Sequence, residues 1–189
     1  MNNKTKTIAG LGLLTAIVVV LQLVASTIKF GPFSITLCLA PIIIGAALYG
    51  WKSGAWLGFV FSVLVLLTDA GAFLAVNVPG TIITVILKGT LCGLVAGLVY
   101  ALLQKINTLL AVIVAGIAAP ITNTGLFLLG CLVFFMPTIN EWAAGAGFPS
   151  AGKFLIVGMV GINFIVELAV NMVLAAVIVQ IIKIAKKSQ

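Results

Sequence analysis

The sequence predicts an all-α integral membrane protein, a single domain over residues 1–189 built as a bundle of six transmembrane helices. Of its 189 residues, 63% are hydrophobic and only 7% are charged, and the mean hydropathy is +1.37. The apolar residues form long runs that short polar segments separate. No polar block of domain size remains outside these runs, so a separate catalytic module is not expected.

The apolar runs predict the spans in chain order. A polar segment, 1–7, precedes a first run from Ile8 to about Ala25. This run is long for a signal peptide and further spans follow it, so we interpret it as an uncleaved first helix. The longer of the later spans can tilt or extend beyond the bilayer. These later spans are expected at about 34–49, 54–67, 80–103, 109–135 and 152–182.

The lysines predict the orientation of the chain. With the N-terminus inside, two lysines, Lys29 and Lys153, lie outside together with Asp69 and Glu141. Seven lysines then flank the spans inside, and this positive-inside bias predicts that both termini are cytoplasmic. The inside lysines are Lys4, Lys6, Lys52, Lys105, Lys183, Lys186 and Lys187.

The connections expected on the outer side, 26–33, 68–79 and 136–151, are longer than the inner turns. Loops of this length in a compact protein are often functional lids. The second of them carries Asn77, which we include among the candidate ligand-binding residues. Trp142 and Phe148 in the third are either part of such a lid or anchors at the membrane interface.

The composition argues against several functions. The net charge of +7 comes from ten scattered lysines that cluster only at span ends, so the membrane explains it and no nucleic-acid partner is predicted. The chain has no histidine and only three acids, which makes a metal site improbable. Cys38, Cys92 and Cys131 are expected to be small buried residues. The spacing of Gly45 and Gly50 resembles a phosphate-binding loop, but Trp51 replaces the required lysine.

The last span carries a polar stripe. Asn163, Glu167 and Asn171 are four residues apart, so on a helix they lie on one face of an otherwise apolar surface. A carboxylate in an apolar span costs roughly 2.5–3.5 kcal/mol on insertion scales and usually faces a bundle interior or a cavity. The stripe either joins helices by hydrogen bonds or binds a solute. We favour the solute because other spans carry candidate partners.

Two other spans carry polar residues at a similar depth. Lys88 lies about eight residues from the outer end of its span, roughly 12 Å into the membrane. Asn123 lies near the middle of the fifth span, close to Pro120, which can free backbone groups. Asn163 is about as deep in the last span, and Glu167 lies one turn deeper. Three consecutive spans are therefore expected to line a small cavity that opens to the outer side.

Lys88 and Glu167 leave two interpretations open. In the first, the lysine neutralises the glutamate as a structural pair. In the second, the lysine meets an anionic group of the solute, while Glu167 accepts hydrogen bonds from solute hydroxyl or amide groups. The two are compatible if the pair opens when the solute binds.

The first helix has a face of small residues. Ala9, Gly12 and Ala16 share one side of it, and the last two have a spacing that permits close helix approach. The pairs Gly54/Gly58 and Gly93/Gly97 repeat that spacing. We interpret most such pairs as internal packing faces. Docking of another membrane subunit is the alternative, and it is strongest for the first helix.

These features resemble the substrate-binding S component of an energy-coupling factor (ECF) vitamin transporter, over the whole chain. Six spans, cytoplasmic termini, a small-residue first helix and polar groups in the last three helices carry the resemblance. Three stretches strengthen it: Phe30-Gly-Pro-Phe-Ser-Ile-Thr-Leu37, Pro41-Ile-Ile-Ile-Gly-Ala-Ala-Leu-Tyr-Gly50, and Val78-Pro-Gly-Thr81 followed by Leu87-Lys-Gly89. Among its branches the chain is most similar to the pantothenate type, whose acid would meet Lys88. Folate, cobalamin and pyridoxine types remain open.

The resemblance implies a high-affinity binder in a prokaryotic plasma membrane, with no enzymatic activity and no cofactor. It would capture a vitamin from outside and dock on a module of a membrane T subunit and two ATPases. Ala9, Gly12 and Ala16 would contact the T subunit, although Gly12 and Thr15 interrupt the alanine-rich motif of some members. The candidate vitamin-binding residues are Asn77, Lys88, Asn123, Asn163, Glu167 and Asn171.

The alternative from another class is a self-sufficient secondary transporter that would use Glu167 or Asp69 as a proton site. The small size of the chain and the absence of recognisable inverted repeats argue against it. A membrane enzyme is disfavoured because the sequence shows no histidine, paired acids or activated nucleophile.

Overall fold

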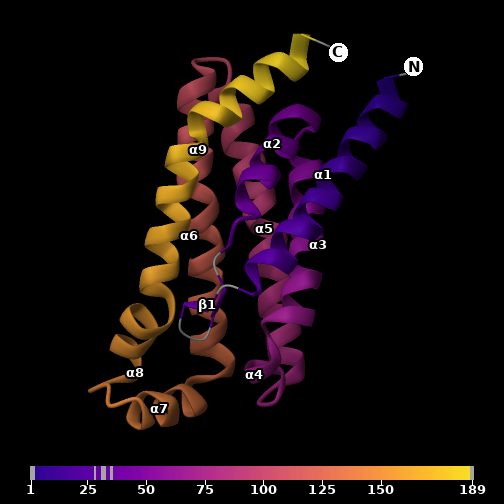
Figure 1. The fold of residues 1–189 in the computed structure, drawn as a ribbon. Coiled ribbons are helices and arrows are strands. Elements are labelled where there is room, and N and C mark those ends of the chain that lie inside the picture. The colour runs from indigo at the N-terminus through magenta and orange to yellow at the C-terminus, as the bar shows by residue number, and fades with distance from the viewer. Residues whose placement is uncertain (1–2, 28, 31–32, 35, 188–189) are drawn as a thin grey trace.

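A computed structural model describes the backbone of residues 3–27, 29–30, 33–34 and 36–187. The side chains at 3–4, 29–30, 33–34 and 186–187 lie outside the described part, and these include Lys4, Lys29, Lys186 and Lys187. Much of the 30–37 stretch quoted above is likewise outside it. The described chain is a bundle of long helices with one small antiparallel hairpin (Figure 1).

The elements follow one another with short connections. The hairpin pairs Lys29 with Ser34 and Phe30 with Phe33. The helices and strands are α1 (Asn3–Ala25), β1 (Lys29–Phe30), β2 (Phe33–Ser34), α2 (Leu39–Tyr49), α3 (Trp51–Thr68), α4 (Gly71–Leu74), α5 (Val78–Leu103), α6 (Thr108–Phe134), α7 (Met136–Gly145), α8 (Ala151–Lys153), the π-helix η1 (Phe154–Gly161) and α9 (Ile162–Lys187).

Five helical segments are long and apolar enough to cross a membrane: Thr5–Ala25, Trp51–Thr68, Val78–Leu103, Thr108–Phe134 and Ala151–Ala185. The prediction of a helical membrane bundle is confirmed at this level. The second predicted span, 34–49, is shorter than expected, because its helix begins only at Leu39. Its 11 residues extend about 16 Å, roughly half of the hydrocarbon core of a bilayer.

Helix α2 is the interior element of the bundle. Eight of its residues are buried, and it packs against α1, α3, α5 and α9. Pro41 lies in its first turn, where a missing N–H needs no helical partner. The chain before it forms the hairpin instead of another helical turn. A short helix surrounded on all sides can be apolar all round without facing lipid.

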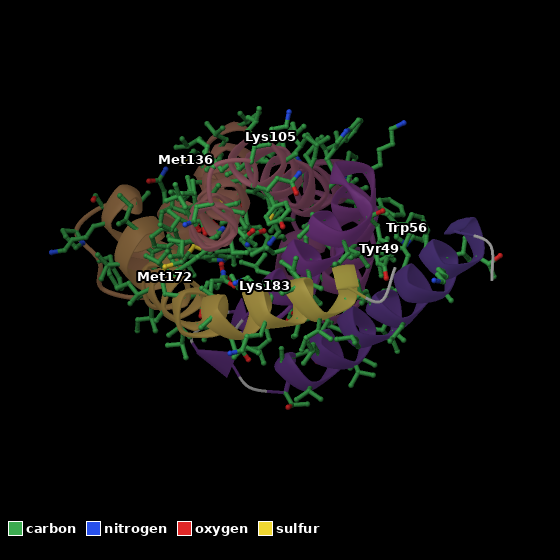
Figure 2. The ribbon with its side chains drawn as sticks, turned by 90° about the horizontal axis from the view of Figure 1, so that it is seen from above. Tyr49, Trp56, Lys105, Met136, Met172 and Lys183 are labelled. Carbon is green, nitrogen blue, oxygen red and sulfur yellow. The ribbon has the colours of Figure 1, made fainter. Side chains whose placement is uncertain are left out.

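Both termini lie at one end of the bundle, and the α2–α3 and α5–α6 turns are at that same end (Figure 1). Helices α4, α7 and α8 lie at the opposite end. Seen from the terminal end, Tyr49 and Trp56 lie beside α1 (Figure 2). Tyr49 packs against Gly10, and Trp56 Nε1 donates a hydrogen bond to Thr15 Oγ1 at 3.3 Å, which fixes this side of α1 to the bundle.

Glycines let α3 and α5 touch backbone to backbone. A Cβ atom on Gly58 would collide with the carbonyl oxygen of Gly89, and one on Gly93 with that of Gly54. A Cβ atom on Gly97 would likewise collide with the backbone of Trp51. The interpretation of the Gly54/Gly58 and Gly93/Gly97 pairs as internal packing faces is therefore confirmed. This contact fixes the helix that carries Lys88.

Replacing Gly93 by alanine is expected to lower the free energy of unfolding by about 1–3 kcal/mol, because the added methyl group forces the α3 and α5 backbones apart. Gly125→Ala is the matched control, since that site in α6 has open space for a Cβ. There the helix propensity of alanine is expected to raise stability by about 0.5–1 kcal/mol. Thermal unfolding in detergent measures both. Equal effects at the two sites would contradict the packing assignment.

Candidate ligand-binding cavity

A cavity of about 520 Å³, part of it open to solvent, lies among α1, α3, α5, α6 and α9. Its walls combine two aromatic rings with amide, hydroxyl, carboxylate and ammonium groups. They are Gln22, Thr36, Phe61, Val65, Asp69, Lys88, Asn123, Thr124, Phe127, Met159, Val160, Asn163 and Glu167.

The α9 wall is built by the polar stripe. Asn163, Glu167 and Asn171 are 8%, 4% and 3% exposed, so all three face inward as their spacing predicts. The first two line the cavity, whereas Asn171 lies beyond it against Gly116 of α6. The π-helix η1 comes directly before them and contributes Met159 and Val160. Wide turns of this kind occur frequently at functional sites.

Glu167 is held from two other elements. Its carboxyl group has side-chain hydrogen-bonding interactions with Thr36 and with Asn123 of α6. Even so, Glu167 Oε2, Asn123 Oδ1 and Asn163 Oδ1 are buried and have no hydrogen-bond partner within the described part of the chain. Each of these three oxygens is an acceptor. The cavity therefore offers acceptors that a bound molecule can satisfy with N–H or O–H groups.

Helix α6 passes through Pro120 without a break. The proline removes one backbone donor, and Thr122 Oγ1 donates to the carbonyl oxygen of Ala118 at 2.8 Å in the same turn. Cys92 of α5 donates from Sγ to the carbonyl oxygen of Ala119 at 3.3 Å. These contacts add donors to two carbonyl groups next to the proline, in the turn that precedes Asn123.

Lys88 brings the cation to the cavity from α5. Its Nζ lies 6.0 Å from the ring centre of Phe61 and 5.6 Å from that of Phe127. Among the described residues, no carboxylate oxygen lies within 4 Å of this Nζ, so a direct ion pair with Glu167, one of the two interpretations left open by the sequence, is not seen at this distance. Both charged groups line the same cavity.

Sequence reasoning missed a polar cluster that closes the cavity toward α1. Gln22 Nε2 donates to Asp69 Oδ2 at 2.7 Å and lies 3.3 Å from Thr68 Oγ1, which itself donates to Asp69 Oδ2 at 2.9 Å. Cys38 Sγ approaches Gln22 Oε1 at 3.8 Å. Gln22 is 1% exposed. The available signal was a lone glutamine inside the first apolar run.

The chain is similar in sequence and in fold to known proteins. Residues 6–179 match the family model described as ECF transporter, substrate-specific component. The chain belongs to this family. It is similar to the pantothenic acid transporter PanT of Lactococcus lactis subsp. cremoris, with 27% identity over 195 residues that cover 94% of this chain and 93% of that protein. It also shares the fold of a solved structure of ThiT from Listeria monocytogenes, at a TM-score of 0.68 and 20% identity over 98% of each chain.

The structure of this ECF transporter component brings four of the six predicted ligand-binding residues together: Lys88, Asn123, Asn163 and Glu167 all line the cavity. Asn77 does not. It precedes α5 as the N-cap, and its Oδ1 accepts a hydrogen bond from the Gly80 N–H at 2.9 Å. The three cysteines are buried and unbridged, as predicted.

The predicted docking face of the substrate-specific component is exposed. Ala9, Gly12 and Ala16 all lie on the outer surface of α1, and no atom lies within 4 Å of the position that a Gly12 Cβ would take. This face is opposite the one held by Tyr49 and Trp56. It thus remains accessible to a neighbouring membrane helix.

Asn77→Ala is expected to lower the free energy of unfolding by about 1 kcal/mol through loss of the cap of α5. Asn107→Ala is the matched comparison, because it removes a cap of the same kind: Asn107 caps α6 by accepting hydrogen bonds from the N–H groups of Leu109 and Leu110. Asn77→Asp keeps the cap and should restore stability. Thermal unfolding of the three variants in detergent measures this. An unchanged melting temperature for Asn77→Ala would show that the cap does not stabilise α5.

Proposed function

We propose that this chain is the vitamin-binding S component of an ECF-type importer and that its vitamin is pantothenate. The observation that carries the proposal is the combination, in one cavity, of a lysine and three acceptor oxygens that have no carboxylate or hydrogen-bond partner, respectively, among the described residues. A ligand that satisfies both has an anionic group at one end and several N–H or O–H donors at the other.

Pantothenate fits this description. Its carboxylate would face Lys88 Nζ, and its amide N–H and hydroxyl groups would face Asn123, Asn163 and Glu167. A buried acceptor without a donor costs about 1–3 kcal/mol, so a ligand that supplies the donors recovers much of that energy. The dimethyl group of pantothenate would contact apolar walls such as Met159 and Val160.

The similarity to PanT over nearly the full length of both chains supports the same vitamin. Folate is acidic too, but it carries a flat pterin ring. The cavity has two aromatic rings, Phe61 and Phe127, and both already lie beside the Lys88 ammonium. This arrangement favours a small flexible acid over a larger stacked ring.

We further propose that the chain crosses the plasma membrane of a prokaryote six times, with α2 completing its span through the preceding hairpin, and that both termini are cytoplasmic. Lys52, Lys105 and Lys183 lie toward the end of the bundle that holds the termini. A basic end of this kind favours the cytoplasmic side. The cavity would then receive vitamin from outside, and a T subunit with two ATPases would drive its release inward.

Lys88→Met tests the ligand. This change keeps the length and apolarity of the side chain and deletes the charge, so it should weaken pantothenate binding by about 2–5 kcal/mol, or roughly 30- to several-thousand-fold. Glu167→Gln should weaken it less, because the amide retains an acceptor oxygen. Isothermal titration in detergent measures the affinities for pantothenate and for its alcohol analogue, which lacks the carboxylate.

The wild type should prefer the acid to the alcohol, and Lys88→Met should abolish this preference. Lys153→Met is the matched control, since Lys153 is exposed at the far end of the bundle. If Lys88→Met keeps the preference for the acid, Lys88 does not read the carboxylate. If neither compound binds the wild type, the vitamin is a different one.

Ala16→Leu tests the partner. Its bulk on the exposed small face of α1 should prevent close approach of the T subunit, while the cavity on the other side stays intact. Pantothenate uptake by cells that contain the ECF module should fall at least ten-fold, and binding by the purified variant should be unchanged. Ala176→Leu, at an exposed alanine of α9, is the matched control and should affect neither. Normal uptake by Ala16→Leu would disprove docking through this face.

A further inference from the structure

A second cavity lies beside the first. Its volume is about 360 Å³ when the open space at its mouth is counted, and Lys88, Phe127, Val65 and Asp69 line both cavities. The remaining walls are mainly apolar and include Ala70, Val85 and Phe135. The side chains at the border therefore face a polar space on one side and a mostly apolar space on the other.

The walls of the second cavity are held in place by packed rings. Phe73 lies edge-on to Phe127, Phe135 and Trp142, with ring centres 5.6, 5.0 and 5.4 Å apart. Ring pairs in this arrangement stabilise one another beyond their apolar burial. Closing the space would require these contacts to be broken. The cavity is thus a shaped feature of the outer end of the bundle.

The wall of the second cavity includes the hydroxyl group of Thr84. Thr84 is 5% exposed, and its Oγ1 has no hydrogen-bond partner within the described part of the chain. Thr81 differs, because its Oγ1 already donates to the carbonyl oxygen of Asn77 at 2.7 Å. A ligand group that enters from the Lys88 side would meet apolar walls and, at Thr84, one hydroxyl able to donate or accept.

We propose that the second cavity is a ligand subsite that accepts a short apolar extension of the carboxyl end of the vitamin. This inference rests on the proposed function, in which that end lies at Lys88. The chemical class it predicts is the secondary amides of pantothenate with short, unbranched alkyl groups. In such a compound the pantoyl part keeps its place beside Asn163 and Glu167, and the alkyl group passes Lys88 into the second cavity.

The test compares amides with one another, because every amide lacks the carboxylate and loses the same interaction with Lys88. Isothermal titration of the purified full chain measures pantothenate, its primary amide, and the N-methyl and N-propyl amides. Each buried methylene should raise affinity about four-fold. The N-propyl amide should thus bind at least ten-fold more tightly than the primary amide. Equal affinities, or weaker binding by the longer amides, would overturn the proposal.

Three variants locate the effect. Ala70→Leu fills the second cavity and should remove the gain of the N-propyl amide, with little change in the affinity for pantothenate itself. Ala72→Leu adds the same side chain to an exposed position of α4 and should preserve the gain. Val85→Ala enlarges the cavity and should shift the optimum to a longer chain, so that an N-pentyl amide gains most.

Pantothenate binding distinguishes a failure of the proposed subsite from a failure of the proposed function. If pantothenate binds and the amide series shows no gain, the subsite is wrong and the proposed function stands. If the gain survives in Ala70→Leu, the alkyl group lies elsewhere and the subsite is wrong. If neither pantothenate nor any amide binds the wild type, the proposed function fails and the subsite fails with it. If Ala70→Leu binds nothing, the chain-length shift in Val85→Ala decides, and its absence overturns the proposal.

Discussion

The structure depends on the cost of keeping unpaired polar groups inside an apolar bundle. Glu167 and Asn123 are 4% and 5% exposed, and each keeps one buried oxygen without a partner in the described part of the chain. Each such atom costs about 1–3 kcal/mol compared with a hydrogen-bonded one. In a membrane no water compensates from the side, so rotation toward lipid would be costlier still. The bundle must therefore hold these groups against a small internal cavity.

The stability that permits this comes from a different part of the molecule. The backbones of α3 and α5 contact each other through glycines, and α2 is buried among its neighbours. Helix α5 belongs both to this packed region and to the wall of the cavity. Gly89 fixes it against Gly58, while the adjacent Lys88 lines the cavity. The close contact thus determines where the cation lies, and the same glycines could not be replaced without moving it.

Hydropathy alone predicted the long helices, because a run of apolar residues needs no knowledge of its neighbours to be recognised. The four-residue spacing of Asn163 and Glu167 likewise predicted an inward polar face. Asn77 was included among the ligand-binding residues, but it caps α5. An asparagine two residues before Pro79 carries the signature of such a helix cap. The π-helix before Asn163 has no comparable signal.

The contacts that sequence reasoning missed join residues far apart in the chain. Gln22 and Asp69 are 47 positions apart and meet only because α1 and α3 cross at the cavity. Phe61 and Phe127 had no polar feature to single them out, yet their rings flank Lys88. Such contacts depend on the angles between helices, which small residues at the crossings determine. The periodicity of polar and apolar residues identifies which face of a helix points inward. It does not identify which face of a neighbouring helix that face contacts.

The surroundings of Lys88 bear on the proposal that a single lysine selects an acid. If Glu167 were its direct partner, a ligand carboxylate would have to displace that partner, and part of the binding energy would be lost in breaking the pair. Here the neighbours of Nζ are the rings of Phe61 and Phe127, which stabilise a cation without neutralising it. Asp69 is already occupied by Gln22 and Thr68. Nζ therefore has no carboxylate oxygen within 4 Å among the described residues. Neutral analogues would leave the charge of Nζ buried and unpaired, and this penalty, more than any attraction to the acid, discriminates against them.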